Sequence, residues 1–250
     1  MWVCSVVVFA GCMGLLITAT KEWKTQVRDE RKFIEPQDLY FMEEASVATA
    51  SASELTSDFV LLNKLTDSEF NSIYSNEGGT KAFNKVNGKT MMVANPGNIL
   101  YITCQASSEY KAAIQYAFSK MSAVSSKIRV TASTKGCYSP NDCFNVACDR
   151  ANNGANAWNS LCCNASAKVV ESGITFNLYY MNSYSTSEKR LIAMHELGHT
   201  FGLKDQPANS DSCKKDITVM RYNYNKSNGY NVHTDYTRFD KANLTSVYGK

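Results

Sequence analysis

The sequence lacks any long block of basic residues and carries little net charge. Its 26 lysines and arginines are nearly balanced by 23 aspartates and glutamates, which gives a formal net charge of +3 over 250 residues. Proteins that bind nucleic acids carry clustered positive charge, so this balance argues against a nucleic-acid partner. Hydrophobic residues make up 44% of the chain, which is typical of a globular domain and not of a disordered segment.

Charged side chains are absent from residues 1–20, and Lys21 ends the run. An apolar stretch of this length can be a signal-peptide core or a single membrane anchor. The usual basic residues at its start are missing, and residues 9–12 (FAGC) loosely resemble a bacterial lipobox. A cleaved signal peptide, an anchor and a lipoprotein leader therefore all stay open. In each case we expect a secreted or surface-attached protein, which contacts a membrane only through this segment and only if the segment stays uncleaved.

Paired Cys-x-x-Cys spacings, which are typical of structural zinc sites, are also absent. Two of the nine cysteines lie in the first twenty residues. Disulfides in an exported protein are the better interpretation of the remaining seven, although an odd number leaves at least one thiol over and the pairing cannot be read from spacing. These seven are Cys104, Cys137, Cys143, Cys148, Cys162, Cys163 and Cys213.

Regular hydrophobic patterns begin near residue 95. Ser185 and Glu188 fit the Ser-x-x-Glu capping box of a helix that Gly202 would end. The order of elements predicts an α/β or α+β domain with one long helix and a closing C-terminal helix. The predicted elements are strands at 99–104, 127–134 and 174–181, a helix at 107–124, a cysteine-rich loop at 136–163, the long helix at 185–202 and a short helix at 240–248.

Histidine is scarce, yet two of the three histidines, His195 and His199, lie four positions apart in the segment HELGHTFGLKD. Residues four apart share one face of a helix, so the two rings can hold one metal ion. A catalytic zinc takes three protein ligands and a water molecule, whose pKa it lowers to about 7. Glu196 is placed to accept a proton from that water and to pass it to a leaving amine.

A third ligand is needed, and the sequence offers two candidates. Gly202 tolerates the left-handed conformation that turns the chain back after the helix, which allows Asp205, three residues further on, to reach the metal. A carboxylate is an accepted zinc ligand. The rival is His233, which lies far along the chain in a polar segment. We expect Asp205 to be the ligand.

These residues resemble a known family. The segment HELGHTFGLKD is similar to the zinc signature of the metzincin metallopeptidases. Asp205 stands where most members have histidine, and in this respect the segment resembles the snapalysins. Downstream, Thr218–Tyr222 resembles the metzincin Met-turn, in which the methionine, here Met220, packs beneath the zinc. The segments 110–121 and 240–249, together with the strand near Ile174, are similar to parts of a matrixin catalytic domain. The resemblance implies an α+β fold with a mixed, twisted sheet, a long active-site helix and a C-terminal helix.

Three departures from the matrixin pattern qualify the resemblance. Tyr222 stands where matrixins usually have proline, and the resemblance to astacins and serralysins implies that it either approaches the zinc and stabilises an oxyanion or is structural. No cysteine lies between Cys12 and Cys104, so the cysteine switch that keeps matrixins latent is absent. With three histidines in all, a second, structural zinc site is not expected.

The prediction is therefore a zinc-dependent endopeptidase of metzincin type that acts on a protein or peptide substrate and is a monomer. Residues 1–20 form the leader, 21–95 a prosegment or stalk, and 96–250 the catalytic domain. A calcium ion is an open alternative as a second cofactor, and the sequence indicates no ligands for it. The strand at 174–181 is either buried core or an edge to which a peptide adds. The alternative function is an inactive zinc-containing binding or adhesive module, against which an intact Glu196 argues.

Overall fold

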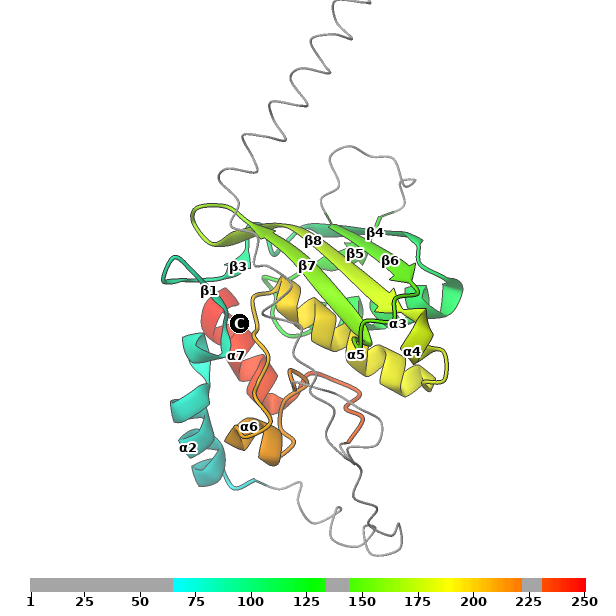
Figure 1. The fold of residues 1–250 in the computed structure, drawn as a ribbon. Helices are drawn as coiled ribbons and strands as arrows, with labels where there is room; N and C mark the ends of the chain where they lie inside the picture. The colour runs from blue at the N-terminus through cyan, green and yellow to red at the C-terminus, as the bar shows by residue number, and fades with distance from the viewer. Residues whose placement is uncertain (1–64, 134–143, 222–230) are drawn as a thin grey trace, which may run out of the picture.

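The computed structural model describes residues 65–133, 144–221 and 231–250, and its centre is a six-stranded mixed sheet (Figure 1). The strand order is β3-β8-β6-β4-β5, with β7 pairing the other side of β8. All pairs are parallel except β7 with β8. The α+β class with a mixed sheet is thus confirmed. The strands are β3 Met92–Val93, β4 Ile99–Gln105, β5 Val130–Ala132, β6 Phe144–Asp149, β7 Ala157–Cys163 and β8 Lys168–Asn177.

Two long helices, α3 (Ser108–Ser122) and α5 (Thr186–Thr200), cover one face of this sheet (Figure 1). The buried face of α3 carries apolar residues at helical spacing, including Ile114, Phe118 and Met121. Burial of this face removes apolar surface from water at about 25 cal/mol per Å². The predicted helix at 107–124 is therefore confirmed, and it contributes to one continuous core under the sheet.

The start of α5 is set by its capping box. The Ser185 side chain accepts from the backbone N–H of Glu188, while the Glu188 carboxylate accepts from the Ser185 N–H at 2.7 Å. Such caps satisfy amide groups that the first turn leaves unbonded, and each contributes about 0.5–2 kcal/mol. Eleven residues of α5 are buried, because the helix lies between the sheet and the C-terminal part of the chain.

A second group of elements lies beside this layer. It consists of α2 (Asp67–Glu77), a short 3-10 helix (Gly79–Ala82), the hairpin of β1 (Lys85–Val86) and β2 (Lys89–Thr90), α6 (Asp211–Lys214) and α7 (Arg238–Tyr248). The Tyr74 hydroxyl of α2 donates to the Ala242 carbonyl of α7 at 3.2 Å. The Asp211 N–H of α6 donates to the Glu77 carboxylate at 2.7 Å. These contacts join α2 to both C-terminal helices.

The predicted boundary between residues 95 and 96 falls between β3 and β4, and residues on both sides of it pack together. β3 pairs with β8 in the main sheet. The Val93 N–H donates to the Tyr248 hydroxyl near the C-terminus at 3.0 Å. Residues 65–95 thus share a folded unit with the described part of residues 96–250, whereas the assignment of 21–95 as a prosegment or stalk stays a prediction.

Several predicted elements were wrong in their limits. The cysteine-rich loop at 136–163 contains two strands, β6 and β7. The strand predicted at 174–181 belongs to β8, which ends at Asn177. The last four residues of the predicted range form the short helix α4 (Leu178–Met181), which the Asn177 side chain caps by accepting from the Tyr179 N–H at 3.1 Å. Because β8 is flanked by β6 and β7, it is interior to the sheet and not a free edge.

The structure describes the side chains of four of the seven cysteines beyond the leader. Residues 1–20, Cys137 and Cys143 lie outside the described residues, as does the side chain of Cys104. Within the described part of the chain, no disulfide joins any two of the other four cysteines. The disulfide framework stays a prediction. Among the helices of the described ranges, none combines the length and the apolar character needed to cross a bilayer.

Candidate metal centre

The two histidines of α5 face each other across one helical turn. Their Nε2 atoms are 3.1 Å apart, and the ring centroids are 4.7 Å apart with the planes nearly perpendicular. His199 is buried and His195 is partly buried. Both rings therefore present one nitrogen to the same point, as the spacing of four predicts.

Backbone carbonyls decide which nitrogen of each ring carries the proton. The Nδ1 of His195 lies 2.9 Å from the Val219 carbonyl oxygen, and that of His199 lies 2.9 Å from the Leu203 carbonyl oxygen. A carbonyl oxygen only accepts, so Nδ1 is the donor in both neutral rings. Each Nε2 is then an unprotonated acceptor, which is the form that binds a metal.

Asp205 completes the group from the loop that follows α5. Its Oδ1 lies 3.2 Å from His195 Nε2 and 3.5 Å from His199 Nε2. One ligand-type atom from each of the three residues lies within 4.8 Å of the others. The chain reverses at Gly202, whose φ is +91°, as expected for a residue that must adopt a left-handed conformation.

Three acceptor atoms that face one another repel unless a cation lies among them. A proton can serve: burial alone would lower the pKa of His199, but the Asp205 carboxylate outweighs it and raises that pKa to about 9. In the same way the two rings outweigh burial and hold the pKa of Asp205 well below its usual range. Two imidazoles and a carboxylate also form a known donor set for zinc, which leaves a fourth position open. The residues therefore fit a divalent metal ion.

Glu196 is buried beside this group. Burial raises the pKa of its carboxyl above the ordinary value, and the nearby His195 and His199 act in the opposite direction. The carboxyl is therefore within electrostatic reach of both rings but does not belong to the three-residue group. A carboxyl with a raised pKa suits proton transfer near neutral pH better than an ordinary surface glutamate does.

Met220 packs against the middle of the two-histidine turn. A Cβ at Gly198 would overlap the Met220 sulfur, so the absence of a side chain at Gly198 allows the thioether to touch the helix. The Gln206 N–H donates to the Met220 carbonyl at 2.6 Å, which links the methionine to the residue after Asp205. Met220 therefore packs against the turn between His195 and His199, which agrees with its place in the Met-turn that the resemblance implies.

A buried carboxylate that the sequence analysis missed holds the segment around Met220. Asp240, the third residue of α7, accepts from the Thr218 hydroxyl at 2.6 Å and from the Val219 N–H at 3.0 Å. The carbonyl of Val219 in turn accepts from His195. Asp240 also forms the capping box of α7 with Thr237. The pattern Thr-x-x-Asp at 237–240 was the available signal, and it places the helix start at Arg238 instead of residue 240.

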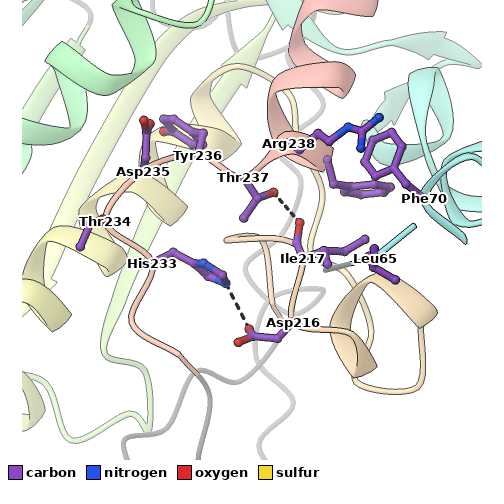
Figure 2. A pocket seen from close by; sticks show the side chains of 11 residues that line it. Leu65, Phe70, Asp216, Ile217, His233, Thr234, Asp235, Tyr236, Thr237 and Arg238 are labelled. Atoms are coloured by element: carbon purple, nitrogen blue, oxygen red, sulfur yellow. Dashed lines mark hydrogen bonds and ion pairs between the residues drawn. The ribbon is translucent and has the colours of Figure 1, made fainter. Parts of the chain in front are cut away.

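The rival ligand, His233, belongs to a different cluster. Its Nε2 lies 3.2 Å from Asp216 Oδ1, and Asp216 also accepts from Arg221 and Asn231. Figure 2 shows His233 directed at Asp216. Both residues line a cavity of about 490 Å³, and none of His195, His199 and Asp205 lines it. Among the described residues His233 is thus not part of the metal-binding group. Tyr222 lies outside the described residues, and its role stays a prediction.

Residues 82–91 form a backbone bracket around the turn that leads to Asp205. The Asn84 N–H donates to the Gly202 carbonyl at 2.8 Å, and the Lys204 N–H donates to the Ala82 carbonyl at 3.0 Å. The Met91 carbonyl lies against the Cα of Gly202, where a Cβ would overlap it. The position of Asp205 therefore depends on a segment more than a hundred residues earlier in the chain.

Gly202→Ala is expected to lower both the melting temperature and the zinc affinity. The new Cβ would cost about 1–2 kcal/mol for the left-handed conformation and about 1–3 kcal/mol for the clash with Met91, and relief of the clash would move the Asp205 turn. The matched control is Gly88→Ala: Gly88 also has positive φ, +74°, but nothing lies within 4 Å of a Cβ there. Calorimetry and competition with a zinc chelator measure both effects. If Gly88→Ala lowers the melting temperature and the zinc affinity as much as Gly202→Ala does, residues 82–91 do not hold the turn that leads to Asp205.

Comparisons with known proteins give a distant structural likeness. No protein-family profile matches the sequence, and no curated protein matches it. Two structures of myroilysin are similar at 14% identity, one covering 64% of this chain and 96% of that chain with a TM-score of 0.43, the other 68% and 95% with a TM-score of 0.44. High choriolytic enzyme 1, a hatching-enzyme zinc protease from the medaka fish Oryzias latipes, is similar at 12% identity over 67% of this chain and 98% of that chain, with a TM-score of 0.40. All three TM-scores are below 0.5, so the functional conclusions depend on the side chains of this protein.

Proposed function

We propose that this protein is a zinc-dependent endopeptidase of metzincin type. The observation that carries the proposal is the convergence of three acceptor atoms, from His195, His199 and Asp205, beside a buried carboxyl, Glu196. A site that only stabilises the fold needs no proton-transfer group next to the metal and is usually closed by a fourth protein ligand. The sequence resemblance in HELGHTFGLKD supports the same function.

The chemistry divides between the metal and the chain. Zinc held by these three ligands would act as a Lewis acid that acidifies water and polarises a carbonyl group. Glu196 accepts a proton from the attacking water and returns it to the leaving amine. The carbonyls of Val219 and Leu203 keep both rings in the required tautomer. Tyr222 is proposed as a further group that stabilises the oxyanion.

The substrate that fits this arrangement is an extended peptide chain. β7 is the antiparallel strand of the sheet and, within the described residues, pairs with β8 alone. No other strand of the described residues pairs with its outer edge, to which an extended peptide can add as a further strand. β7 also lies next to α5 (Figure 1), so a peptide on this edge would lie beside the helix that carries the metal ligands.

The location of the protein forms a further part of the proposal. Residues 1–20 are apolar and uncharged, which supports export to the extracellular space or to the cell surface. An exported peptidase would act on protein substrates in that compartment. We expect it to be a monomer. Disulfides among the seven cysteines beyond the leader would suit the same compartment.

The deciding experiment is peptide cleavage by the purified protein with and without a chelator. We expect the protein to cleave unstructured peptides, to stop when the chelator removes the metal, and to recover when zinc is restored in slight excess. Mass spectrometry of the products identifies internal cleavage sites. A protein that binds zinc stoichiometrically but leaves a diverse peptide library intact would contradict the proposal and favour the binding or adhesive module.

A further inference from the structure

A closed cluster of four polar side chains lies in the core between the sheet and α5. It contains Tyr101 of β4, Asn159 of β7, Ser172 of β8 and Thr200 of α5, and each of these residues is at most 4% exposed. Because water cannot reach them, each must find its partners within the protein. The cluster joins three strands to the last turn of the helix that carries the metal ligands.

The contacts of Asn159 fix the orientation of its amide. Its Nδ2 donates to the Glu196 carbonyl oxygen at 2.7 Å and to Thr200 Oγ1 at 2.8 Å. A backbone carbonyl only accepts, so the atom that faces it must be the amide nitrogen. The amide oxygen then accepts from the Ser172 hydroxyl at 2.8 Å. Both hydrogens and the oxygen of this amide are therefore used.

The remaining hydroxyl groups complete the cluster. Tyr101 and Thr200 lie 2.8 Å apart, as do Tyr101 and Ser172, and Ser172 and Thr200. The Ser172 hydrogen is already donated to Asn159, so only the hydrogens of Tyr101 and Thr200 remain for these three contacts. Each of the four side chains can then be hydrogen-bonded. A fully satisfied buried network of this kind specifies one arrangement of its members.

The contact with Glu196 lies two residues before Gly198, the single glycine of α5. Gly198, which makes room for the Met220 sulfur, costs about 1 kcal/mol of helix stability relative to alanine. Glu196, Gly198 and His199 share one turn, and Asn159 bonds to the first residue of this turn and to Thr200, directly after it. The amide thus spans the turn that contains the glycine and attaches both of its ends to β7.

We propose that Asn159 is a positioning residue for the metal centre. It holds the Glu196–Thr200 turn against the sheet, so that the Glu196 carboxyl and the His199 ring keep their places relative to His195 and Asp205. Asn159 touches neither the substrate nor the reacting atoms. The effect of Asn159 on catalysis rests on the proposed peptidase function. Its effect on the geometry of the ligands requires only that the site binds a metal.

Two substitutions and one rescue variant test the role. Asn159→Asp keeps the shape of the side chain but removes the N–H donors and places an acceptor against the Glu196 carbonyl. Thr200→Val keeps the shape but removes the hydroxyl, whereas Thr200→Ser retains it. Ile128→Ala is the control, because Ile128 is buried in the same core without belonging to the cluster, so its loss destabilises the protein without altering the turn.

Zinc affinity is measured by competition with a chromogenic chelator, and kcat and KM are measured with a peptide substrate on the zinc-loaded protein. For Asn159→Asp and Thr200→Val we expect zinc affinity and kcat each to fall by about 10- to 100-fold, as for other partners of metal ligands, with KM little changed. Thr200→Ser should have the zinc affinity and the kcat of the wild-type protein, because serine retains the hydroxyl group. Ile128→Ala should lower the melting temperature and leave both unchanged.

The outcomes separate this proposal from the proposed function. If wild-type protein cleaves no peptide, the peptidase function fails, and the zinc affinities still decide the role of Asn159. The positioning role is overturned if Asn159→Asp and Thr200→Val retain wild-type zinc affinity. It is also overturned if, at an equal loss of melting temperature, their zinc affinity falls no more than that of Ile128→Ala. Should Asn159→Asp fail to fold, the contrast between Thr200→Val and Thr200→Ser decides in the same way.

Discussion

Replacement of Glu196 by glutamine is expected to abolish peptide cleavage and to leave zinc bound. The amide has nearly the same size and still forms hydrogen bonds, but it cannot accept the proton of a water molecule at neutral pH. General base catalysis contributes about 10²- to 10⁴-fold, so kcat should fall by at least this range. Zinc should stay bound because Glu196 is not one of the three ligand residues.

The measurement pairs kcat/KM on a peptide substrate with the zinc content after dialysis. Glu69→Gln is a suitable control, since Glu69 is an exposed residue of α2 and glutamine can replace glutamate in its capping box. This control should keep both values. If Glu196→Gln cleaves peptides within tenfold of the wild-type rate, Glu196 is not the general base and the mechanism must be assigned to another group.

Replacement of Asp205 by alanine is expected to strip the protein of zinc at neutral pH. Without this carboxylate, only His195 and His199 remain in the group, and zinc sites in proteins normally have at least three protein ligands. The fold should persist, because Asp205 lies in a loop whose backbone is held by Ala82 and Met220 through its neighbours Lys204 and Gln206. Circular dichroism before and after dialysis distinguishes loss of metal from loss of structure.

The matched comparison is His233→Ala. His233 offers a zinc-binding side chain, but its ring is directed at Asp216 (Figure 2). This variant should keep the metal and most of the activity. Zinc content measured on both purified proteins decides between the candidates. A zinc-free His233→Ala beside a zinc-replete Asp205→Ala would reverse the assignment of the third ligand.

Local patterns were read correctly where the interactions that form an element lie close in sequence. The capping box of Ser185 and Glu188 closes within four residues, and the spacing of His195 and His199 places both rings on one helical face whatever surrounds it. Asn87-Gly88 carries the same kind of local signal. This dipeptide is typical of tight hairpin turns, and it joins β1 to β2 with φ values of +51° and +74°.

Elements that depend on distant partners were misread. β6 and β7 lie in a segment rich in cysteine and asparagine, residues without strong β-propensity, and they exist as strands because β8 pairs with both. Strand formation depends on packing and pairing more than on intrinsic preference. The pattern at 178–181 predicts the end of a strand, because the apolar run that forms α4 is too short to show a helical period.

The sequence by itself determined the chemistry of the metal centre: which residues can bind zinc, which can move a proton, and that the two histidines share a face. These properties follow from side-chain type and from the helical repeat. Only the tertiary structure decided that Asp205, and not His233, meets the two rings, because residues 82–91 hold the intervening turn. It also brought Asn159 to the Glu196 carbonyl and Asp240 to Val219. Such contacts join residues tens of positions apart, and no periodic pattern records which of many polar side chains the packed sheet and helices will bring together.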